Sequence, residues 1–369
     1  MEQEGWTCQN CGRHNSSFAR FCANCGTLQP GLWECVNGHL NPPFYNYCTI
    51  CGMPHSKEAH PSPTRDWAEL TKLYIGRAVD VKLPGLKPRP LRRKLSIHGY
   101  ECYSLLGRGG LAVTLLGIDE NGVNHVLKVP SAFYDWKVDG IGGRRTTYTS
   151  FGREVEALKT VSGMNHPCIV KFENSFEAKG DDPPTLVFEY CDGGSLGDLM
   201  QETGRLKPSP AVEIIVQIAD ALAAIHEKGY SHGDVKPENI LFTRDRIPRL
   251  ADFNSARAMA MSSRSRVPFT PGYAAPEHVK SGWPSIEGDV WSLGVVLYEA
   301  VTEGQLFPYD ESKYWEILAE LEDGKRTLSI STGDKELDGI VQGCLKPKPE
   351  DRLSMRRLEY MLIEYLRGK

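Results

Sequence analysis

The chain lacks the features that would place it in a membrane or outside the cell. No run approaches the roughly 18 consecutive apolar residues of a membrane-spanning helix. The first residues, Met-Glu-Gln-Glu-Gly-Trp, are acidic and polar, unlike a secretory signal. The net charge is only −4 over 369 residues, so the chain has no general attraction to nucleic acid or anionic lipid. We therefore expect a cytoplasmic protein with no membrane partner.

Cysteine is scarce outside the first 51 residues, which hold seven of the 11. The other four, Cys102, Cys168, Cys191 and Cys344, are isolated, as buried thiols in a reducing compartment usually are. The clustered CxxC pairs are different, because such pairs in a chain without an export signal indicate metal. Disulfides are the alternative for the cluster.

The cysteine-rich region is an internal repeat with an offset of about 27 residues. Each unit, 1–28 and 29–55, is too small to bury a core, so something else must hold it together. Two CxxC-type turns can supply four tetrahedral ligands, which predicts two structural Zn²⁺ ions. The expected ligands are Cys8, Cys11, Cys22 and Cys25 in the first unit, and Cys35, His39, Cys48 and Cys51 in the second. For His39 the alternative is a surface imidazole beside a three-ligand site.

Each unit resembles a short zinc ribbon of the tandem, double-ribbon kind, and the first unit also looks like a Ran-binding-protein-type zinc finger. Members of that family bind single-stranded RNA or ubiquitin. RNA binding needs an exposed aromatic residue with arginines beside it. Trp6, Arg13 and Arg20 would serve in the first unit, but the second unit has no arginine. We therefore favour a protein partner or a purely structural role for the ribbons over nucleic-acid binding.

Residues 56–97 read as a connector rich in proline and basic residues. Residues 56–98 contain 10 Lys and Arg against 4 Asp and Glu, and the stretch from Lys82 to Lys94 has six basic residues and no acidic one. The proline density predicts an extended, semi-rigid spacer. A solvated linker is the favoured interpretation, and assistance to nucleic-acid binding is the alternative.

The rest of the chain, 98–368, reads as one large domain whose strands come first and whose helices follow. Short apolar runs predict strands at Val113–Leu116, Val126–Val129 and Thr185–Phe188, and helical spacing predicts helices at Ala211–His226 and Asp289–Tyr298. Strands followed by helices favour an α+β fold.

Short polar motifs follow one another along this domain. They are Gly107-Arg-Gly109-Gly110, Lys128 in Val-Leu-Lys, His232-Gly-Asp-Val-Lys-Pro-Glu-Asn239, Asp252-Phe-Asn254 and Ala275-Pro-Glu277. Glycines let a backbone approach phosphates, and Asp and Asn offer the hard oxygen ligands that Mg²⁺ prefers. Their order and spacing resemble those of Hanks-type (eukaryotic-like) serine/threonine protein kinases. The resemblance implies a two-lobed fold, with a β-rich N-lobe and a helical C-lobe, which binds ATP and Mg²⁺ and acts on a protein substrate.

The resemblance also implies roles for individual residues. Asp234 would accept or orient the proton of the substrate hydroxyl, and Lys236 is the mark of serine/threonine specificity. The nucleotide would meet Gly107, Gly109, Ala112 and Lys128 and the hinge residues Glu189 and Cys191, while Asn239 and Asp252 would hold Mg²⁺. Glu154 would be the ion-pair partner of Lys128, with Glu156 as the competitor. Glu277 would pair with Arg352, and Asp289 would anchor the catalytic loop.

The chain departs from the family pattern at control positions. Gly233 replaces an arginine that normally meets a phosphate on the activation loop. Asn254 replaces a glycine that permits unusual backbone angles, although Asn tolerates positive φ better than most residues. Ala112 stands at the third glycine of the loop. None of these changes removes a group that handles phosphate, metal or protons.

We therefore predict an active kinase whose activity does not depend in the usual way on phosphorylation of its activation loop, which carries Ser262, Ser263 and Ser265. The first alternative is a pseudokinase scaffold, motivated by Gly233, Asn254 and Ala112. The second is a zinc-ribbon nucleic-acid reader that localises a kinase.

Overall fold

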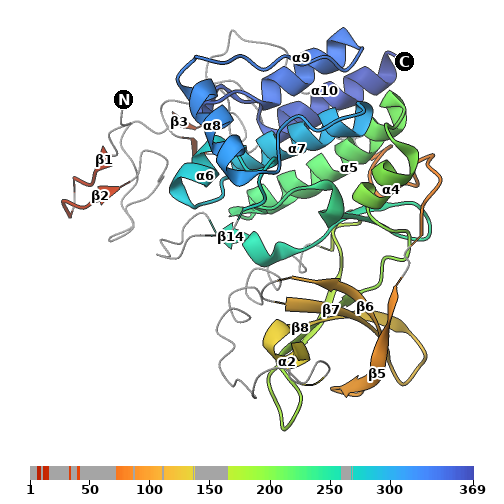
Figure 1. The fold of residues 1–369 in the computed structure, drawn as a ribbon. Coiled ribbons are helices and arrows are strands. Elements are labelled where there is room, and N and C mark those ends of the chain that lie inside the picture. The colour runs from red at the N-terminus through yellow and green to blue at the C-terminus, as the bar shows by residue number, and fades with distance from the viewer. Residues whose placement is uncertain are drawn as a thin grey trace.

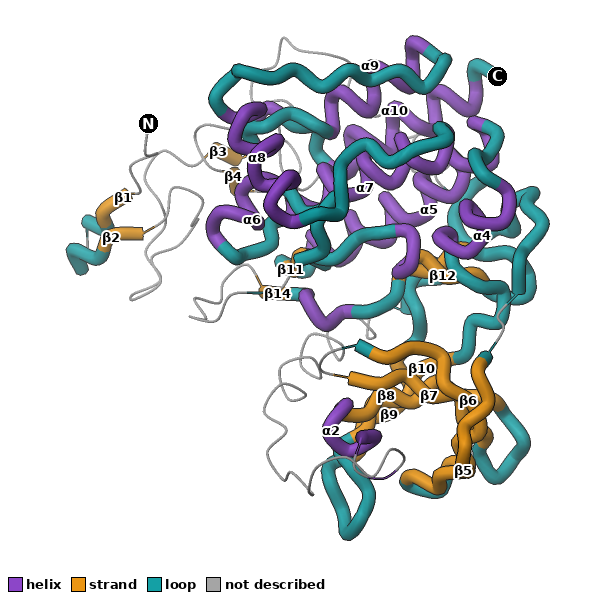
Figure 2. Tube along the Cα trace, in the orientation of Figure 1, coloured by secondary structure: helices purple, strands orange, loops and turns teal. Residues whose placement is uncertain are grey.

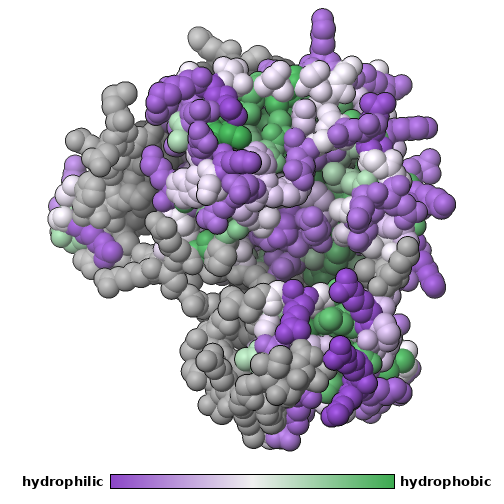
Figure 3. All heavy atoms as spheres, viewed as in Figure 1, coloured by the Kyte–Doolittle hydropathy of each residue, from purple (hydrophilic) through white to green (hydrophobic). Residues whose placement is uncertain are grey.

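A strand-rich lobe and a larger helical lobe make up most of the computed structural model (Figures 1 and 2). The residues that it describes are 6–9, 11–15, 33–34, 40–41, 72–85, 88–109, 112–135, 137, 165–258, 267 and 269–369. Hydrophilic side chains cover much of the described surface seen in Figure 3. The predicted two-lobed α+β fold is confirmed.

The smaller lobe is built on a six-stranded antiparallel sheet with the order β5-β6-β7-β8-β10-β9. Its strands are β5 (Arg89–Ile97), β6 (Tyr100–Arg108), β7 (Ala112–Ile118), β8 (Asn124–Pro130), β9 (Phe172–Phe176) and β10 (Thr185–Glu189). The predicted strands at 113–116, 126–129 and 185–188 lie within β7, β8 and β10. Alternate apolar side chains of β7 and β8 form a small core with residues of β5, β6 and the short helix α2 (Ser131–Tyr134), which packs against β7 and β8.

The larger lobe is helical. Its helices are α4 (Leu196–Thr203), α5 (Pro208–Glu227), α6 (Pro276–Ser281), α7 (Ile286–Val301), α8 (Glu311–Glu322), α9 (Lys335–Cys344) and α10 (Met355–Arg367), with the 3₁₀ turn η4 (Pro349–Asp351). The predicted helices at 211–226 and 289–298 lie within α5 and α7. Helix α5 packs against α7 and α10, and together they form the main apolar core of the protein.

Helix α5 is long and apolar, although charged and polar residues interrupt its apolar runs. Its 20 residues have a mean hydropathy of 1.4 over the best window, so by length and composition it would pass for a membrane span. Most of that window, 67%, is buried inside the protein. The pattern is that of a core helix, whose apolar residues face neighbouring helices on several sides.

Short strands and 3₁₀ turns carry the polar motifs around Asp234, Asn239 and Asp252. They are β11 (Tyr230–Ser231), η2 (Pro237–Asn239), β12 (Ile240–Phe242), β13 (Pro248–Leu250), η3 (Phe253–Ser255) and β14 (Arg257–Ala258). Strands β12 and β13 pair as a hairpin, and β11 pairs with β14. The β11–β14 pair encloses the β12–β13 hairpin in the sequence. Residues just before β12 therefore lie close to residues just after β13.

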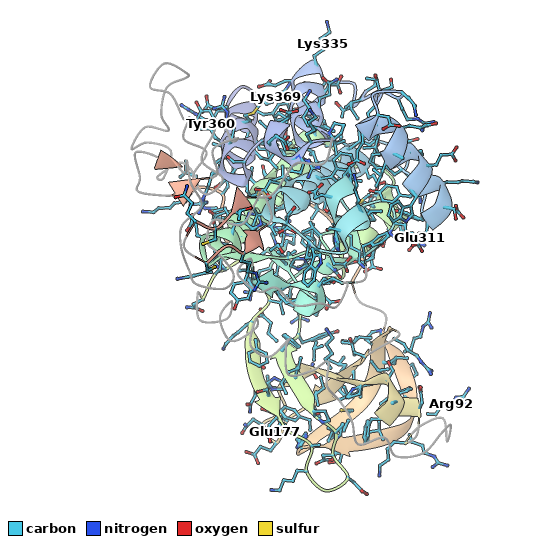
Figure 4. The ribbon with its side chains drawn as sticks, turned by 90° about the vertical axis from the view of Figure 1, so that its left-hand side faces the viewer. Arg92, Glu177, Glu311, Lys335, Tyr360 and Lys369 are labelled. Atoms are coloured by element: carbon cyan, nitrogen blue, oxygen red, sulfur yellow. The ribbon has the colours of Figure 1, made fainter. Side chains whose placement is uncertain are left out.

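The stretch predicted to be a solvated connector differs from that expectation. Residues 89–97 form β5, an edge strand paired with β6, with a bulge between Pro90 and Leu95. Most of its basic side chains are exposed, and Arg92 points away from the sheet in Figure 4. The pairing is possible because Leu91 and Leu95 pack onto the apolar core of the sheet while the charged residues stay in water.

Two small hairpins are described near the N-terminus. Strand β1 (Trp6–Thr7) pairs with β2 (His14–Asn15), and β3 (Trp33–Glu34) pairs with β4 (Leu40–Asn41). They fall at equivalent places in the sequence repeat, which agrees with two similar units.

Candidate active site

The glycine-rich turn joins β6 to β7 at one end of the sheet. The backbone N–H of Gly109 donates to the carbonyl oxygen of Ala112 at 2.8 Å, and the Ser131 hydroxyl donates to the Gly109 carbonyl oxygen at 2.8 Å. Among the described residues, a Cβ at Gly107 would meet nothing within 4 Å. Ala112 already belongs to β7, opposite Pro130, where an alanine side chain is accommodated.

Lys128 lies on β8 beneath this turn. Its side chain is largely buried, and its Nζ lies 2.8 Å from Oδ1 of Asp252. Burial of an amine requires a nearby carboxylate, because an unpaired charge away from water is costly. The predicted partner Glu154 and its competitor Glu156 lie outside the described residues, so the choice between them stays a prediction.

The hinge follows β10. The Glu189 carboxylate accepts a hydrogen bond from the backbone N–H of Lys171 at 2.6 Å and forms an ion pair with Arg249. The Glu189 side chain is therefore engaged by Lys171 and Arg249. At this end of β10, the backbone groups would be the ones that bind the base of a nucleotide. Burial raises the pKa of the Cys191 thiol to about 12, so this side chain is a small neutral surface.

The catalytic loop places Asp234 at the centre of a polar cluster. Its Oδ1 accepts from the Thr270 hydroxyl at 2.6 Å, and Lys236 Nζ lies 2.8 Å from its Oδ2. Lys236 also donates to the Thr270 oxygen at 2.9 Å. The Asn239 amide nitrogen donates to the Asp234 backbone oxygen at 2.8 Å and to Oδ2 at 3.1 Å. A hydroxyl group is therefore already bonded to both Asp234 and Lys236.

Thr270 is the residue whose position the sequence did not reveal. It stands 36 residues after Asp234, in the segment Thr270-Pro-Gly-Tyr273. No periodicity or short spacing links it to the catalytic loop. Its contact with Asp234 depends on the path of the chain between them, and part of that path lies outside the described residues.

Asp289 on α7 anchors the start of the catalytic loop, at His232 and Gly233, as predicted. Its two carboxylate oxygens accept from the backbone N–H groups of His232 and Gly233, each at 2.8 Å, and from the His226 ring nitrogen at 2.8 Å. Burial would raise the pKa of Asp289, but the hydrogen bond and charge of His226 outweigh it, so the pKa is lowered. An ionised, fully bonded carboxylate fixes the loop immediately before Asp234.

Asp252 and Asn239 meet because they flank the β12–β13 hairpin. The backbone N–H of Ala251 donates to the Asn239 carbonyl oxygen at 2.8 Å. Asp252 adopts a left-handed backbone with φ 65, while Phe253 is buried and meets the His232 ring edge-on at 5.0 Å. Asn254 lies inside the 3₁₀ turn η3, so its backbone is not left-handed and the loss of a glycine there is accommodated.

Gly233 has a conformation that explains the missing arginine. Its φ is +80, and a Cβ would lie 2.8 Å from the Cβ of Pro284 and 3.0 Å from the Ser255 carbonyl oxygen. Real Cβ atoms do not approach other atoms so closely, and L-residues rarely adopt this φ. In this structure the position therefore has no room for a side chain.

The predicted Glu277–Arg352 pair is confirmed. Two parallel hydrogen bonds of 2.7 Å join the guanidinium to the carboxylate, and the Ser285 hydroxyl adds a third to Glu277 at 2.9 Å. The Arg352 guanidinium also lies 5.1 Å from the centre of the Trp291 ring. Burial would raise the pKa of Glu277, but Arg352 outweighs it, so the pKa is lowered. The pair ties α6 to the end of the helical lobe.

Most of the predicted zinc ligands lie outside the described residues. They are Cys22, Cys25, Cys35, His39, Cys48 and Cys51. Within the part of the chain that the structure describes, no group of three or more metal-ligating side chains is brought together. Cys8 and Cys11 are described at the turn of the first hairpin, where the Cys8 N–H donates to the Arg13 carbonyl at 2.8 Å and Gly12 has φ 70.

A model of the protein kinase domain matches residues 100–361 of this chain. Serine/threonine-protein kinase PknB of Mycobacterium leprae is 31% identical over 264 residues, which cover 69% of this chain and 40% of that protein. Serine/threonine-protein kinase cds1 of Schizosaccharomyces pombe is 29% identical over 268 residues, 69% of this chain and 56% of that protein. PknL of Mycobacterium bovis is 33% identical over 227 residues, 60% and 54% of the two chains. The chain thus spans about half the length of these relatives.

Proposed function

The chain belongs to the protein kinase family, as a serine/threonine kinase by its relatives, and from this premise we propose that it transfers the γ-phosphoryl group of ATP to serine or threonine of a protein. The observation that carries the proposal is the Thr270 hydroxyl, which donates to Asp234 and accepts from Lys236. A substrate hydroxyl presented to the same two side chains would be oriented in the same way. Asp234 would then accept its proton, and Lys236 would offset the negative charge that develops beside it.

The described residues fit ATP with Mg²⁺. Lys128 and the turn at Gly107 and Gly109 would meet the phosphates, and the backbone at Glu189 and Cys191 would meet the base. Asn239 uses its amide nitrogen toward Asp234, which leaves its carbonyl oxygen for a cation beside Asp252. Hard oxygen donors of this kind suit Mg²⁺, which would neutralise phosphate charge during transfer.

The test is incorporation of labelled phosphate by the full chain, located by mass spectrometry. Asp234→Asn and Lys128→Met should abolish incorporation. Asp234→Asn should still bind a fluorescent ATP analogue, because the side chain that it changes faces the acceptor and not the base. Equal incorporation by wild type and Asp234→Asn would contradict the proposal. Nucleotide binding without any incorporation by wild type would favour the pseudokinase alternative.

We propose that control does not run through a loop phosphate. The support is the conformation of Gly233, which leaves no place for the arginine that would receive one. Replacing Ser262, Ser263 and Ser265 together by alanine should leave the specific activity within about twofold of wild type, an energetic difference well below that of a single charged hydrogen bond. Loss of activity that acidic replacements restore would refute this.

We propose that residues 1–55 form two zinc ribbons that bind a protein partner. The hairpin turn at Cys8 and Cys11, with its left-handed Gly12, has the form of a turn that presents two thiolates to one metal. Metal analysis of the full chain should find two zinc ions per chain. The double change Cys22→Ser and Cys25→Ser should remove one of them, while the control Cys102→Ala should leave both. Zinc content that the first change does not lower would exclude the first site.

A nucleic-acid reader is the second candidate for the N-terminal part, and the exposed basic residues of β5 favour it. Binding of this kind is strongly salt-dependent, because phosphate contacts release counterions. A salt-dependent mobility shift of single-stranded RNA by the full chain, lost on charge removal at Arg92, Arg93 and Lys94, would support the reader. No mobility shift at low salt would exclude nucleic-acid binding.

We also propose a cytoplasmic location, which is tested by cell fractionation.

A further inference from the structure

Residues 72–85, which precede the sheet, lie against the helical lobe instead of in solvent. We call this segment the strap. Figure 1 shows it in orange beside α4, before the chain enters β5. Val79 is only 1% exposed and belongs to the main core of the helical lobe. Other apolar side chains of the strap pack against the same core, namely Tyr74, Ile75, Val81 and Leu83.

The middle of the strap is fixed by hydrogen bonds to two distant parts of the lobe. The backbone N–H of Val79 donates to the carbonyl oxygen of Arg246 at 3.1 Å, in the β12–β13 turn. The side-chain amide of Gln217, on α5, donates to the carbonyl oxygen of Arg77 at 3.1 Å. Gln217 is itself only 1% exposed, so this bond is made in the interior, where an unpaired amide would be costly.

The end of the strap lies against the turn that follows the hinge. A Cβ at Gly193 would be 2.7 Å from Cδ1 of Leu83, and a Cβ at Gly194 would be 3.1 Å from Cγ of Pro84. Leu83 and Pro84 thus occupy the space that side chains at these two positions would take. The two glycines allow the strap to pack directly onto the backbone of the turn.

The same turn is also bound to β12. The N–H of Gly193 donates to the Phe242 carbonyl oxygen at 2.9 Å, and the N–H of Phe242 donates to the Gly194 carbonyl oxygen at 2.8 Å. The turn is therefore held by both β12 and the strap. Cys191, the hinge residue whose backbone would meet the base, stands two residues before it.

We propose that the strap positions the hinge for nucleotide binding, with Leu83 and Val79 as the positioning residues. The inference rests on the proposed function for the role of the hinge, although not on phosphoryl transfer itself. Neither residue would touch the nucleotide. Val79 holds the strap on the helical lobe, and Leu83 limits the movement of Gly193, so that the backbone at Cys191 is presented in one arrangement. A hinge that must be ordered on binding weakens affinity by the cost of that ordering.

The test uses the full chain with Leu83→Ala, and Leu83→Val as a milder second variant. Leu73 is the matched control, because it is a leucine of the same strap that is 51% exposed. Leu83→Ala should raise the dissociation constant for a fluorescent ATP analogue roughly tenfold, which corresponds to about 1.4 kcal/mol. The KM for ATP should rise with it, while kcat and the KM for a peptide substrate stay within about twofold. Amide hydrogen exchange over residues 189–196 should become faster, and Leu73→Ala should change none of these.

The outcomes separate positioning from simple packing. If Leu83→Ala lowers the melting temperature but leaves nucleotide affinity and hinge exchange as in wild type, the strap is only a piece of the core and the inference fails. If Leu83→Ala does not fold, Leu83→Val should show the same pattern at a smaller size, and wild-type affinity there overturns it. Absence of phosphate transfer in wild type and in every variant would contradict the proposed function. The dissociation constant for the ATP analogue and the hydrogen exchange of residues 189–196 would still decide the role of the strap.

Discussion

Adding a side chain at Gly233 is expected to destabilise the protein instead of restoring a receptor for a loop phosphate. A left-handed backbone costs an L-residue about 1–2 kcal/mol. The new Cβ would also press on Pro284 and on the Ser255 carbonyl oxygen, at 2.8 Å and 3.0 Å. Forced contacts of this kind typically cost about 1–3 kcal/mol. For Gly233→Ala the expected loss of unfolding free energy is therefore about 2–5 kcal/mol.

Gly204 provides a matched control. It also has a positive φ, +72, at the end of α4, but among the described residues a Cβ there would meet nothing within 4 Å. Gly204→Ala should therefore lose only the cost of an unfavourable backbone conformation, about 1–3 kcal/mol. Urea unfolding measures both, as shifts of the midpoint at an unchanged m-value. Equal losses in the two variants would refute the argument from Pro284 and Ser255.

Activity provides the second readout for position 233. The Gly233 N–H donates to Asp289 at 2.8 Å, and the next residue is Asp234. A displaced backbone at Gly233 would move the group that accepts the substrate proton, so Gly233→Arg should lower kcat. Wild-type stability in Gly233→Arg, together with activity that now depends on phosphorylation of the loop, would show that the position does accept an arginine.

Further expectations concern Thr270 and the Glu277–Arg352 pair. Thr270→Ala should lower kcat about tenfold or more, since hydrogen bonds to charged groups contribute about 1.5–3 kcal/mol, while Thr270→Ser should stay near wild type; equal kcat values would contradict it. Arg352→Met should cost up to about 3–5 kcal/mol in urea unfolding, because it leaves the partly buried Glu277 carboxylate without its partner, and a loss below 1 kcal/mol would disprove this. The lowered pKa of Glu277 means that its stabilisation is present above the ordinary glutamate pKa and is lost as pH falls toward the folded-state value. Glu277→Gln should flatten that acid limb in a pH series of unfolding free energies, and an unchanged limb would exclude this carboxylate as its source.

The elements with strong periodicity could be predicted from the sequence. The alternating apolar residues of β7 and β8 and the apolar face of α5 depend on local spacing, which the chain carries in itself. The polar motifs are also local, since His232 to Asn239 form one continuous loop. The Glu277–Arg352 pair is joined across 75 residues, and it was predictable only because the family resemblance supplied the pairing.

The connector shows where local reasoning is insufficient. Its prolines and basic residues predict an extended, solvated segment. Residues 89–97 are extended, as β5, whereas residues 72–76 form turns. Whether an extended segment lies in water or on a surface depends on what faces it. Leu91 and Leu95 meet the core of the sheet, and Val79 and Leu83 meet the helical lobe, so the segment is bound. No property of residues 72–97 alone indicates those receiving surfaces.

The sequence by itself determined the lobed architecture, the family and the chemical groups at the centre, because these depend on residue type and on spacing along the chain. Only the tertiary structure decided which groups meet. It brought Thr270 to Asp234, closed position 233 with Pro284 and Ser255, and seated Leu83 on Gly193. Such contacts join residues far apart in the chain. They follow from the packing of the whole molecule, in which each atom's available space is set by neighbours that local sequence does not specify.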